Sequence, residues 1–182
     1  MTDEEILQRI AEGDEKAFSE FVEKYKGKAF SLLRSICKNN FDAEEALQDV
    51  FMKVMNYAST FRGDAKVSTW FYKITYHTGL KYSITRRKHK TEFLDEILES
   101  RDFGDEIKNE DSLEQDLILK LIAELSGKQS TVITLFYLNE LSIEEIVETL
   151  KITESDVKTT LHRGRNNLYN IIKTRNLEKE LK

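Results

Sequence analysis

The chain contains no proline, and this absence constrains its fold more than any other feature of the sequence. Proline and glycine are the residues that most often interrupt helices, and only seven of the 182 residues are glycine. Apolar residues also recur every three to four positions over long stretches, which is the spacing of one face of an α-helix. The sequence therefore predicts an all-α fold.

The first half of the chain contains four helical patterns, over residues 3–12, 15–37, 43–57 and 68–90. Thr2 and Glu5 have the spacing of a capping box at the start of the first pattern, and Asp42 is expected to be the N-cap of the third. A polar, glycine-containing loop at 60–66 separates the last two patterns. We therefore expect a four-helix domain over residues 1–91.

Residues 141–168 have the pattern of two short helices joined by a tight turn at 151–153. Ser142 and Glu145 form a capping-box pair before the first helix, and Thr153 followed by Asp156 repeats this spacing before the second. Apolar residues at helical spacing give each helix one side to bury: Ile146, Val147 and Leu150 in the first, and Val157, Leu161 and Leu168 in the second. The pattern predicts a helix-turn-helix unit.

The second helix of this unit is basic. From Val157 to Arg175 the sequence has five Lys or Arg residues and no acid. A helix that enters a DNA groove needs an apolar side docked on its partner helix, with cations free to meet phosphates and base edges. We interpret the unit as DNA-binding, against the alternative of a helical hairpin with a solvated basic face.

The net charge of −5 argues against nucleic-acid binding until the distribution of the charges along the chain is considered. Residues 92–116 carry 11 acidic and two basic side chains, whereas the segments before and after them have net charges of +3 and +1. This composition predicts an acidic flexible linker, with a weak helical turn near residues 93–98, between the domain at 1–91 and a four-helix domain at 117–182. The linker either occupies a basic channel in a partner or is a solvated tether without a further role.

Several functions lack their sequence signals. No apolar run approaches the roughly 20 residues needed to span a membrane, and the acidic N-terminus is unlike a signal peptide. The single cysteine, Cys37, is expected to be a buried small hydrophobe in the reducing cytoplasm. His77, His89 and His162 lie in different segments without metal-ligand spacing, and no phosphate loop or catalytic set is present. We predict no metal, no cofactor and no catalytic residue, and hence no enzyme.

Four stretches together resemble bacterial RNA polymerase sigma factors of the extracytoplasmic-function (ECF) type, in the sigma-70 family. They are DAEEALQDVF at 42–51, FRGD at 61–64, STWFYKI at 68–74 and the helix-turn-helix unit at 141–168. Each motif alone is degenerate, but their order and distances also match. The resemblance implies a region 2-like helical bundle and a region 4-like helix-turn-helix domain, which direct core polymerase to a promoter and help to melt it.

The resemblance also implies partners and contact residues. A coiled coil on the largest subunit of core RNA polymerase would bind Asp42, Glu45, Gln48 and Asp49. The loop before the Ser-Thr-Trp stretch would capture a flipped base of the −10 element through Phe61, Arg62, Gly63, Asp64 and Lys66. The basic run at the end of the following helix would hold nearby phosphates through Arg86, Arg87 and Lys88. The recognition helix would read the −35 element through Ser155, Lys158, Thr159, Thr160, His162, Arg163 and Arg165. An anti-sigma factor that clamps the two domains together is a further expected partner.

The chain departs from the family pattern at several positions. His77 and Lys81 stand where the family usually has Asn and Asp, Lys151 stands at a turn that commonly carries Gly, and Thr160 stands where Arg is frequent. These departures predict a promoter preference that differs from the commoner family members, or weaker duplex binding by this domain. Separately, a stand-alone helix-turn-helix regulator remains an alternative, and its N-terminal sensor domain should contain a pocket. A helical interaction scaffold is a third possibility, which would not require a basic recognition helix.

Overall fold

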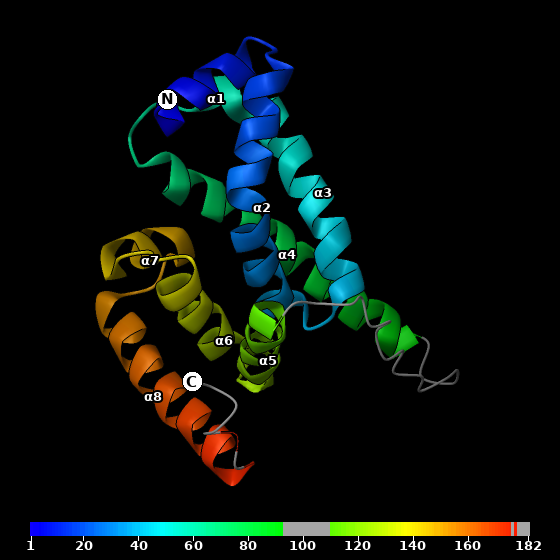
Figure 1. The fold of residues 1–182 in the computed structure, drawn as a ribbon, viewed down its shortest axis with the longest axis vertical. Coiled ribbons are helices and arrows are strands. Elements are labelled where there is room, and N and C mark those ends of the chain that lie inside the picture. The colour runs from blue at the N-terminus through cyan, green and yellow to red at the C-terminus, as the bar shows by residue number, and fades with distance from the viewer. Residues whose placement is uncertain (93–109, 176, 178–182) are drawn as a thin grey trace.

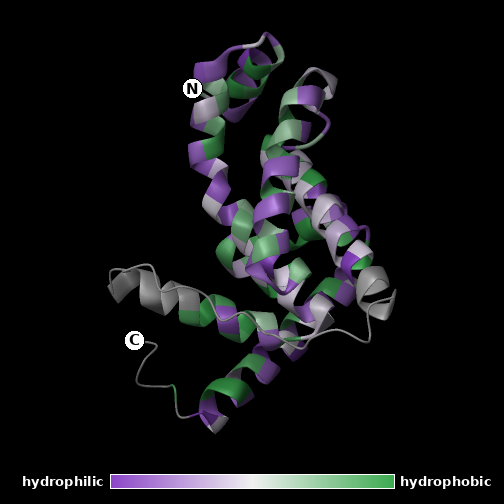
Figure 2. Ribbon diagram, turned by 90° about the vertical axis from the view of Figure 1, so that its right-hand side faces the viewer, coloured by the Kyte–Doolittle hydropathy of each residue, from purple (hydrophilic) through white to green (hydrophobic). Residues whose placement is uncertain are grey.

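The structure is a computed structural model that describes residues 1–92, 110–175 and 177, without the side chains of 87–92 and 110–116. Every regular element in these ranges is a helix, which confirms the predicted all-α fold (Figure 1). None of the described helices has the length and apolar character needed to cross a membrane. Figure 2 shows hydrophilic and hydrophobic residues alternating along the helices, as expected where one side is exposed.

The N-terminal half contains the four predicted helices. They are α1 (Asp3–Ala11), α2 (Glu15–Cys37), α3 (Asn40–Tyr57) and α4 (Val67–Glu92), with a 3-10 turn η1 (Ala58–Thr60) after α3. The predicted capping box holds the start of α1, because the Glu5 amide donates to Thr2 Oγ1 at 3.2 Å and the Thr2 amide donates to Glu5 Oε2 at 2.8 Å. The long helices α2, α3 and α4 pack on one another, and α1 covers one end of α2.

The start of α3 differs from the prediction. Its N-cap is Asn39, not Asp42, because Asn39 Oδ1 accepts a hydrogen bond from the Asp42 amide at 2.8 Å. Asp42 is therefore already inside the first turn, where a carboxylate is favourable next to the positive end of the helix dipole. Both residue types are good N-caps, and the sequence pattern alone does not distinguish two sites three residues apart.

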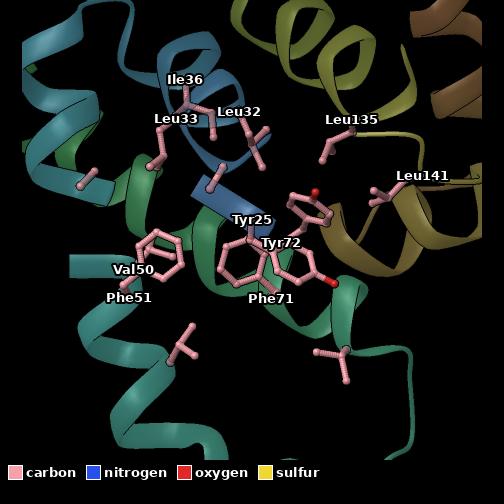
Figure 3. Close-up of a cluster of buried hydrophobic side chains, with 14 of the residues drawn as sticks. Tyr25, Leu32, Leu33, Ile36, Val50, Phe51, Phe71, Tyr72, Leu135 and Leu141 are labelled. Atoms are coloured by element: carbon pink, nitrogen blue, oxygen red, sulfur yellow. The ribbon is translucent and has the colours of Figure 1, made fainter. Parts of the chain in front are cut away.

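Aromatic side chains from α2 and α4 form the centre of the N-terminal core (Figure 3). The ring of Phe21 stacks on Tyr25 at a centroid distance of 4.5 Å and meets Phe71 edge-on at 5.3 Å. Tyr72 lies beside this group and is only 1% exposed. These contacts fix α2 against α4, and they place the loop before α4 at a defined position on the surface.

The C-terminal half contains α5 (Glu110–Glu124), α6 (Gly127–Ile133), a π-helical turn η2 (Thr134–Leu138), α7 (Ile143–Leu150) and α8 (Glu154–Thr174). Because α5 begins at Glu110, residues 110–116 are helical and not part of a flexible linker as predicted. The helix is held by tertiary packing, since Leu121 and Ile122 are buried and α5 contacts α2 and α8. The helical turn predicted near residues 93–98 lies outside the described residues.

The two halves pack directly against each other. Helix α7 lies along α4, while α2 contacts α5, α6 and η2. The buried apolar residues of both halves belong to one continuous cluster, in which Leu135 and Leu141 lie close to Tyr72 (Figure 3). The described parts of the two halves therefore pack together into one closed body.

Candidate functional site

The polar face of α3 is the first candidate surface. Glu45 and Gln48 point to solvent, because α3 buries its opposite side, including Ala46 and Val50, against α2 and α4. Glu44 is exposed beside them. The result is an acidic, amide-bearing surface on a rigid helix, which the described part of the C-terminal half leaves uncovered.

The other two predicted residues of this face are bonded to α4. The Arg86 guanidinium contacts Asp42 Oδ2 at 2.8 Å, and the side-chain nitrogen Nδ2 of Asn39 donates to the same oxygen at 2.7 Å. Asp49 Oδ2 accepts a hydrogen bond from the Tyr82 hydroxyl at 2.9 Å. Burial and this bond raise the pKa of Tyr82 to about 12, so the hydroxyl remains a donor at neutral pH. Asp42 and Asp49 therefore form the inner edge of the surface, and Glu45 and Gln48 form its exposed centre.

Three apolar residues of α3 were not identified as surface residues from the sequence. Phe41 is 66% exposed, Met52 57% and Met55 49%. They lie seven residues before, and four and seven residues after, Gln48, so all three follow one side of the helix. This spacing was readable in the sequence, but the stronger apolar stripe that includes Val50 and Val54 obscured it.

The loop between η1 and α4 is the second candidate surface. Arg62, Gly63 and Asp64 are exposed, and Gly63 has a positive φ of 78°, which a residue with a side chain rarely adopts. Phe61 is half-buried, and its ring meets Trp70 edge-on at a centroid distance of 5.8 Å. Trp70 is itself half-buried, so its ring is not wholly in the core and packs against Phe61 of the loop.

Two of the basic residues assigned to this surface, Lys66 and Arg86, form ion pairs with acidic side chains. Lys66 Nζ lies 3.0 Å from Glu145 Oε1 of α7, and Arg86 pairs with Asp42 as described. The side chains of Arg87 and Lys88 lie outside the described residues, although their backbone continues α4. The structure brings Phe61, Arg62, Gly63, Asp64 and Lys66 together in one loop, and it places Arg86 on the far half of α4, beside α3.

The helix-turn-helix unit has the predicted capping. At the start of α7 the Ser142 backbone amide donates to Glu145 Oε2 at 2.8 Å, and the Glu145 backbone amide donates to Ser142 Oγ at 3.2 Å. At the start of α8 the Asp156 backbone amide donates to Thr153 Oγ1 at 3.1 Å. Lys151 ends α7 in the left-handed conformation, with φ of 57°. Lys151 thus adopts, with its side chain, the left-handed conformation that glycine commonly supplies at this turn.

The outer face of α8 is the third candidate surface. Six of the residues predicted to contact DNA are exposed on it: Ser155, Lys158, Thr159, His162, Arg163 and Arg165. Thr160 was also predicted to contact DNA, but it is only 7% exposed and lies on the buried side with Val157 and Leu161. The spacing explains the error, because Thr160 follows Val157 by three residues and so shares its face. Gly164 completes this side, where α8 approaches Ile133 of α6 closely.

The described residues contain no group of three or more His, Cys, Asp or Glu side chains that could hold a metal ion. Cavities of about 220 and 410 Å³ each have walls from both halves of the chain. Neither is a pocket enclosed by the N-terminal helices alone, which the sensor alternative requires.

Two family models match the chain. Sigma-70 region 2 matches residues 21–89, and Sigma-70, region 4 matches residues 115–168. The first match contains α3, the loop and most of α4, and the second contains the helix-turn-helix unit. All three candidate surfaces therefore fall inside a matched region.

Similar proteins cover nearly the whole chain. The ECF RNA polymerase sigma factor SigW of Bacillus subtilis (strain 168) is 34% identical over 171 residues, with 87% of this chain and 90% of SigW covered. The ECF RNA polymerase sigma-E factor of Haemophilus influenzae is 29% identical over 182 residues, with 94% and 96% covered.

Two solved structures share the fold. The sigma factor RpoE from Bartonella quintana, in complex with the anti-sigma factor NepR, has a TM-score of 0.73 at 20% identity, covering 87% of this chain and 98% of RpoE. CnrH, in complex with the cytosolic domain of CnrY, has a TM-score of 0.68 at 17% identity, covering 94% and 97%. Together with the two matched regions and the identity to SigW, these likenesses lead to one conclusion: the chain belongs to the ECF family of RNA polymerase sigma factors, which bind core polymerase and direct it to promoters.

Proposed function

We propose that the polar face of α3 is the surface through which this sigma factor binds core polymerase. Glu45 and Gln48 form the exposed centre of that face, with Asp42 and Asp49 along its inner edge. The partner is a coiled coil of the largest polymerase subunit, with basic side chains opposite these carboxylates. The observation that carries this proposal is that the acidic face lies on a rigid helix, is exposed, and is not covered by the described part of the C-terminal half.

The apolar residues beside the acidic centre support the same assignment. Phe41, Met52 and Met55 are large and about half or more exposed, which is costly unless a partner covers them. Interfaces commonly take most of their binding energy from a few such side chains, whereas rim charges speed and orient association. The face has both components on one rigid helix, so it suits an amphipathic, basic helical partner.

The loop and α8 are assigned to the promoter. Phe61, Arg62, Gly63, Asp64 and Lys66 would receive a base flipped out of the −10 element, with Trp70 as support for the Phe61 ring. Arg86, Arg87 and Lys88 would hold nearby phosphates, for which Arg86 must leave Asp42. The exposed residues of α8 (Ser155, Lys158, Thr159, His162, Arg163 and Arg165) would read the −35 element in the major groove. Thr160 is not among them, because it is buried.

The chain acts on the polymerase and the promoter in the cytoplasm, and the polymerase performs the chemistry. Two similar folds were solved with a bound protein, one of which is an anti-sigma factor. An inhibitor of this kind, which holds the free factor away from polymerase, is the third partner we propose.

Gel filtration of the chain with core polymerase tests the docking surface. The wild-type chain should co-elute with polymerase in a one-to-one complex, and Glu45→Lys should weaken the complex without changing the thermal unfolding of the free chain. Glu20→Lys is the matched control, because Glu20 is an exposed acid on α2, away from the α3 face. Equal co-elution of Glu45→Lys and Glu20→Lys would remove the α3 face from the interface, and failure of the wild-type chain to co-elute would remove polymerase as the partner.

A further inference from the structure

Helix α3 carries a single basic residue among its acids. The acidic residues are Asp42, Glu44, Glu45 and Asp49, and Lys53 is the only Lys or Arg in the helix. Lys53 follows Asp49 by four residues, so the two side chains are neighbours on the helix surface. An acid followed by a lysine at this spacing readily forms an ion pair within a helix. The α3 face therefore has a cation of its own, placed where it could neutralise one of its carboxylates.

Asp49 and Lys53 bond to α4 and form no ion pair with each other, in the part of the chain that the structure describes. Helix α4 lies beside α3 (Figure 1). Lys53 Nζ donates to Thr78 Oγ1 at 2.8 Å, and the Tyr82 hydroxyl donates to Asp49 Oδ2 at 2.9 Å. Thr78 and Tyr82 are also four residues apart, so one turn of α4 faces one turn of α3. Two hydroxyl groups thus separate an acid and a base that the helix period brings together.

Burial explains why Lys53 bonds to Thr78. Thr78 is only 1% exposed, and Lys53 is half-buried, so the ammonium group lies against α4. A buried polar atom that loses its partner costs more free energy than an exposed ion pair contributes. The bond to Thr78 therefore prevails over a surface pair with Asp49.

The partner of Asp49 leaves its charge intact. The Tyr82 hydroxyl is uncharged at neutral pH, because burial and the bond to Asp49 raise the pKa of Tyr82 to about 12. Asp42 gives the contrast, since its carboxylate pairs with the cationic Arg86 at 2.8 Å. Of the two acids on the inner edge of the α3 face, Asp49 is thus the one whose negative charge no cation offsets.

We propose that Thr78 and Tyr82 are positioning residues for polymerase binding, which hold Lys53 against α4 and keep Asp49 from pairing with it. The proposal rests on the proposed role of the α3 face. A basic partner then meets the Asp49 carboxylate without repulsion from Lys53. Because charges at the edge of an interface mainly set how fast and in which orientation the partners associate, the association rate is the quantity that should respond.

Removing both hydroxyls tests the proposal. Thr78→Val with Tyr82→Phe retains the shapes of the two side chains and releases Asp49 and Lys53 to pair with each other. The measurements are the association rate constant of the full chain with immobilised core polymerase at low salt, by biolayer interferometry, and the thermal unfolding of each free variant. The double variant should associate about three- to tenfold more slowly than the wild-type chain, as expected when a charge at an interface edge is neutralised.

The same helix offers a matched control, Thr75→Val with Tyr76→Phe. Thr75 is buried like Thr78, and Tyr76 is half-buried like Tyr82. Neither control residue meets the α3 seam through its hydroxyl in the described bonds: Thr75 Oγ1 donates to the Phe71 carbonyl oxygen of its own helix, and Tyr76 lines the cavity of about 410 Å³ between the two halves. The control should associate at the wild-type rate.

Removing the lysine separates a positioning role from a structural one. Lys53→Met added to the double variant should restore the association rate to within about twofold of wild type, although both hydroxyls are still missing. Lys53→Met in the wild-type chain should change the rate by less than about twofold, because Lys53 is already held away from Asp49. A loss caused by a disturbed fold would not be recovered by removing Lys53.

Tyr82→Phe alone carries the test if the double variant melts at a lower temperature than its control, because Tyr82 is half-buried and the change removes one atom. Association as fast as that of the control, in either the single or the double variant, would overturn the positioning role, and so would a loss that Lys53→Met fails to restore.

The Glu45→Lys experiment distinguishes this failure from failure of the docking surface. If Glu45→Lys weakens the polymerase complex while the hydroxyl variants bind normally, the α3 face stands and the positioning role is wrong. If Glu45→Lys binds as well as Glu20→Lys, the surface itself is wrong and the positioning role falls with it.

Discussion

At the scale of single residues, Lys151 is held against its conformational preference. It ends α7 with φ of 57°, a left-handed conformation that costs a residue with a side chain roughly 1–2 kcal/mol and costs glycine almost nothing. Lys151→Gly should therefore stabilise the fold, by about 0.5–1 kcal/mol once the greater freedom of glycine in the unfolded chain is subtracted. Urea denaturation measures the gain. Lys151→Ala removes the same charge without relieving the backbone, and an equal gain in that variant would assign the effect to charge.

Cys37 gives a second prediction at this scale. Burial raises the pKa of its thiol to about 12, and the side chain is 7% exposed, with Sγ facing the Gly79 carbonyl oxygen. Because the thiolate is the reactive form, the native chain at pH 8 should react with a thiol reagent at least about a hundredfold more slowly than the chain in guanidinium chloride. Absorbance with a disulfide reagent follows both rates, and fast reaction of the native chain would contradict the burial.

At the scale of elements, local signals predicted most of the helices. The bounds of α2 match the periodic pattern at residues 15–37, and the capping pairs at Thr2 and Ser142 form as the spacing indicated. The start of α5 was missed because the average charge of 92–116 concealed a stretch that continues, without a break, into the packed end of α5 at Leu121 and Ile122. The ion pairs of Lys66 and Lys73 with α7 could not be predicted, since nothing in a helical period links residues about 75 positions apart.

The glycines of α2 and α8 give a matched prediction about elements. Gly27 lies in the exposed middle of α2, where a Cβ would meet open space, so Gly27→Ala should stabilise the fold by about 0.5–1 kcal/mol through helix propensity. At Gly164 a Cβ would lie 2.9 Å from Ile133 Cγ1, so the Ile133 side chain or one of the two helices must shift there. Gly164→Ala should therefore destabilise by about 1 kcal/mol despite the same gain in propensity. Thermal melts should show a higher melting temperature for Gly27→Ala and a lower one for Gly164→Ala than for the wild-type chain. An increase in both melting temperatures would refute close packing at Gly164.

Helix α8 also carries a prediction about DNA. Arg163 and Arg165 are exposed on its outer face, so replacing both with alanine should weaken promoter binding by the polymerase complex and reduce the slope of log K against log salt by about 1–2. Arg175→Ala is the control at the C-cap of the same helix, because Arg175 is paired with Glu124 at 2.7 and 2.8 Å. An unchanged slope in the double variant would exclude phosphate contacts by these arginines.

At the scale of the whole molecule, the closed form is too short to read a promoter. The −10 and −35 elements lie about 25 base pairs apart, which is about 85 Å of DNA at 3.4 Å per step. A compact chain of this length has a diameter of only about 40 Å. In the closed structure α7, beside the recognition helix α8, lies directly against α4, beside the −10 loop. With the proposed assignments of the loop and α8 to the promoter, reading both elements at once requires the halves to separate, while the proposed docking through α3 does not.

A covalent lock distinguishes these two steps. Lys73→Cys with Glu148→Cys, joined by a short bismaleimide, should hold α4 and α7 together, since the native side chains meet at 2.6 Å and Cys37 is buried away from the reagent. The locked chain should still co-elute with core polymerase but support less than about a tenth of the promoter-specific transcription of the same variant treated with a monofunctional maleimide. The reason is geometric, because the lock retains the α3 face and prevents the span of about 85 Å that two promoter elements demand. Full transcription by the locked chain would mean that the closed structure itself is the active form.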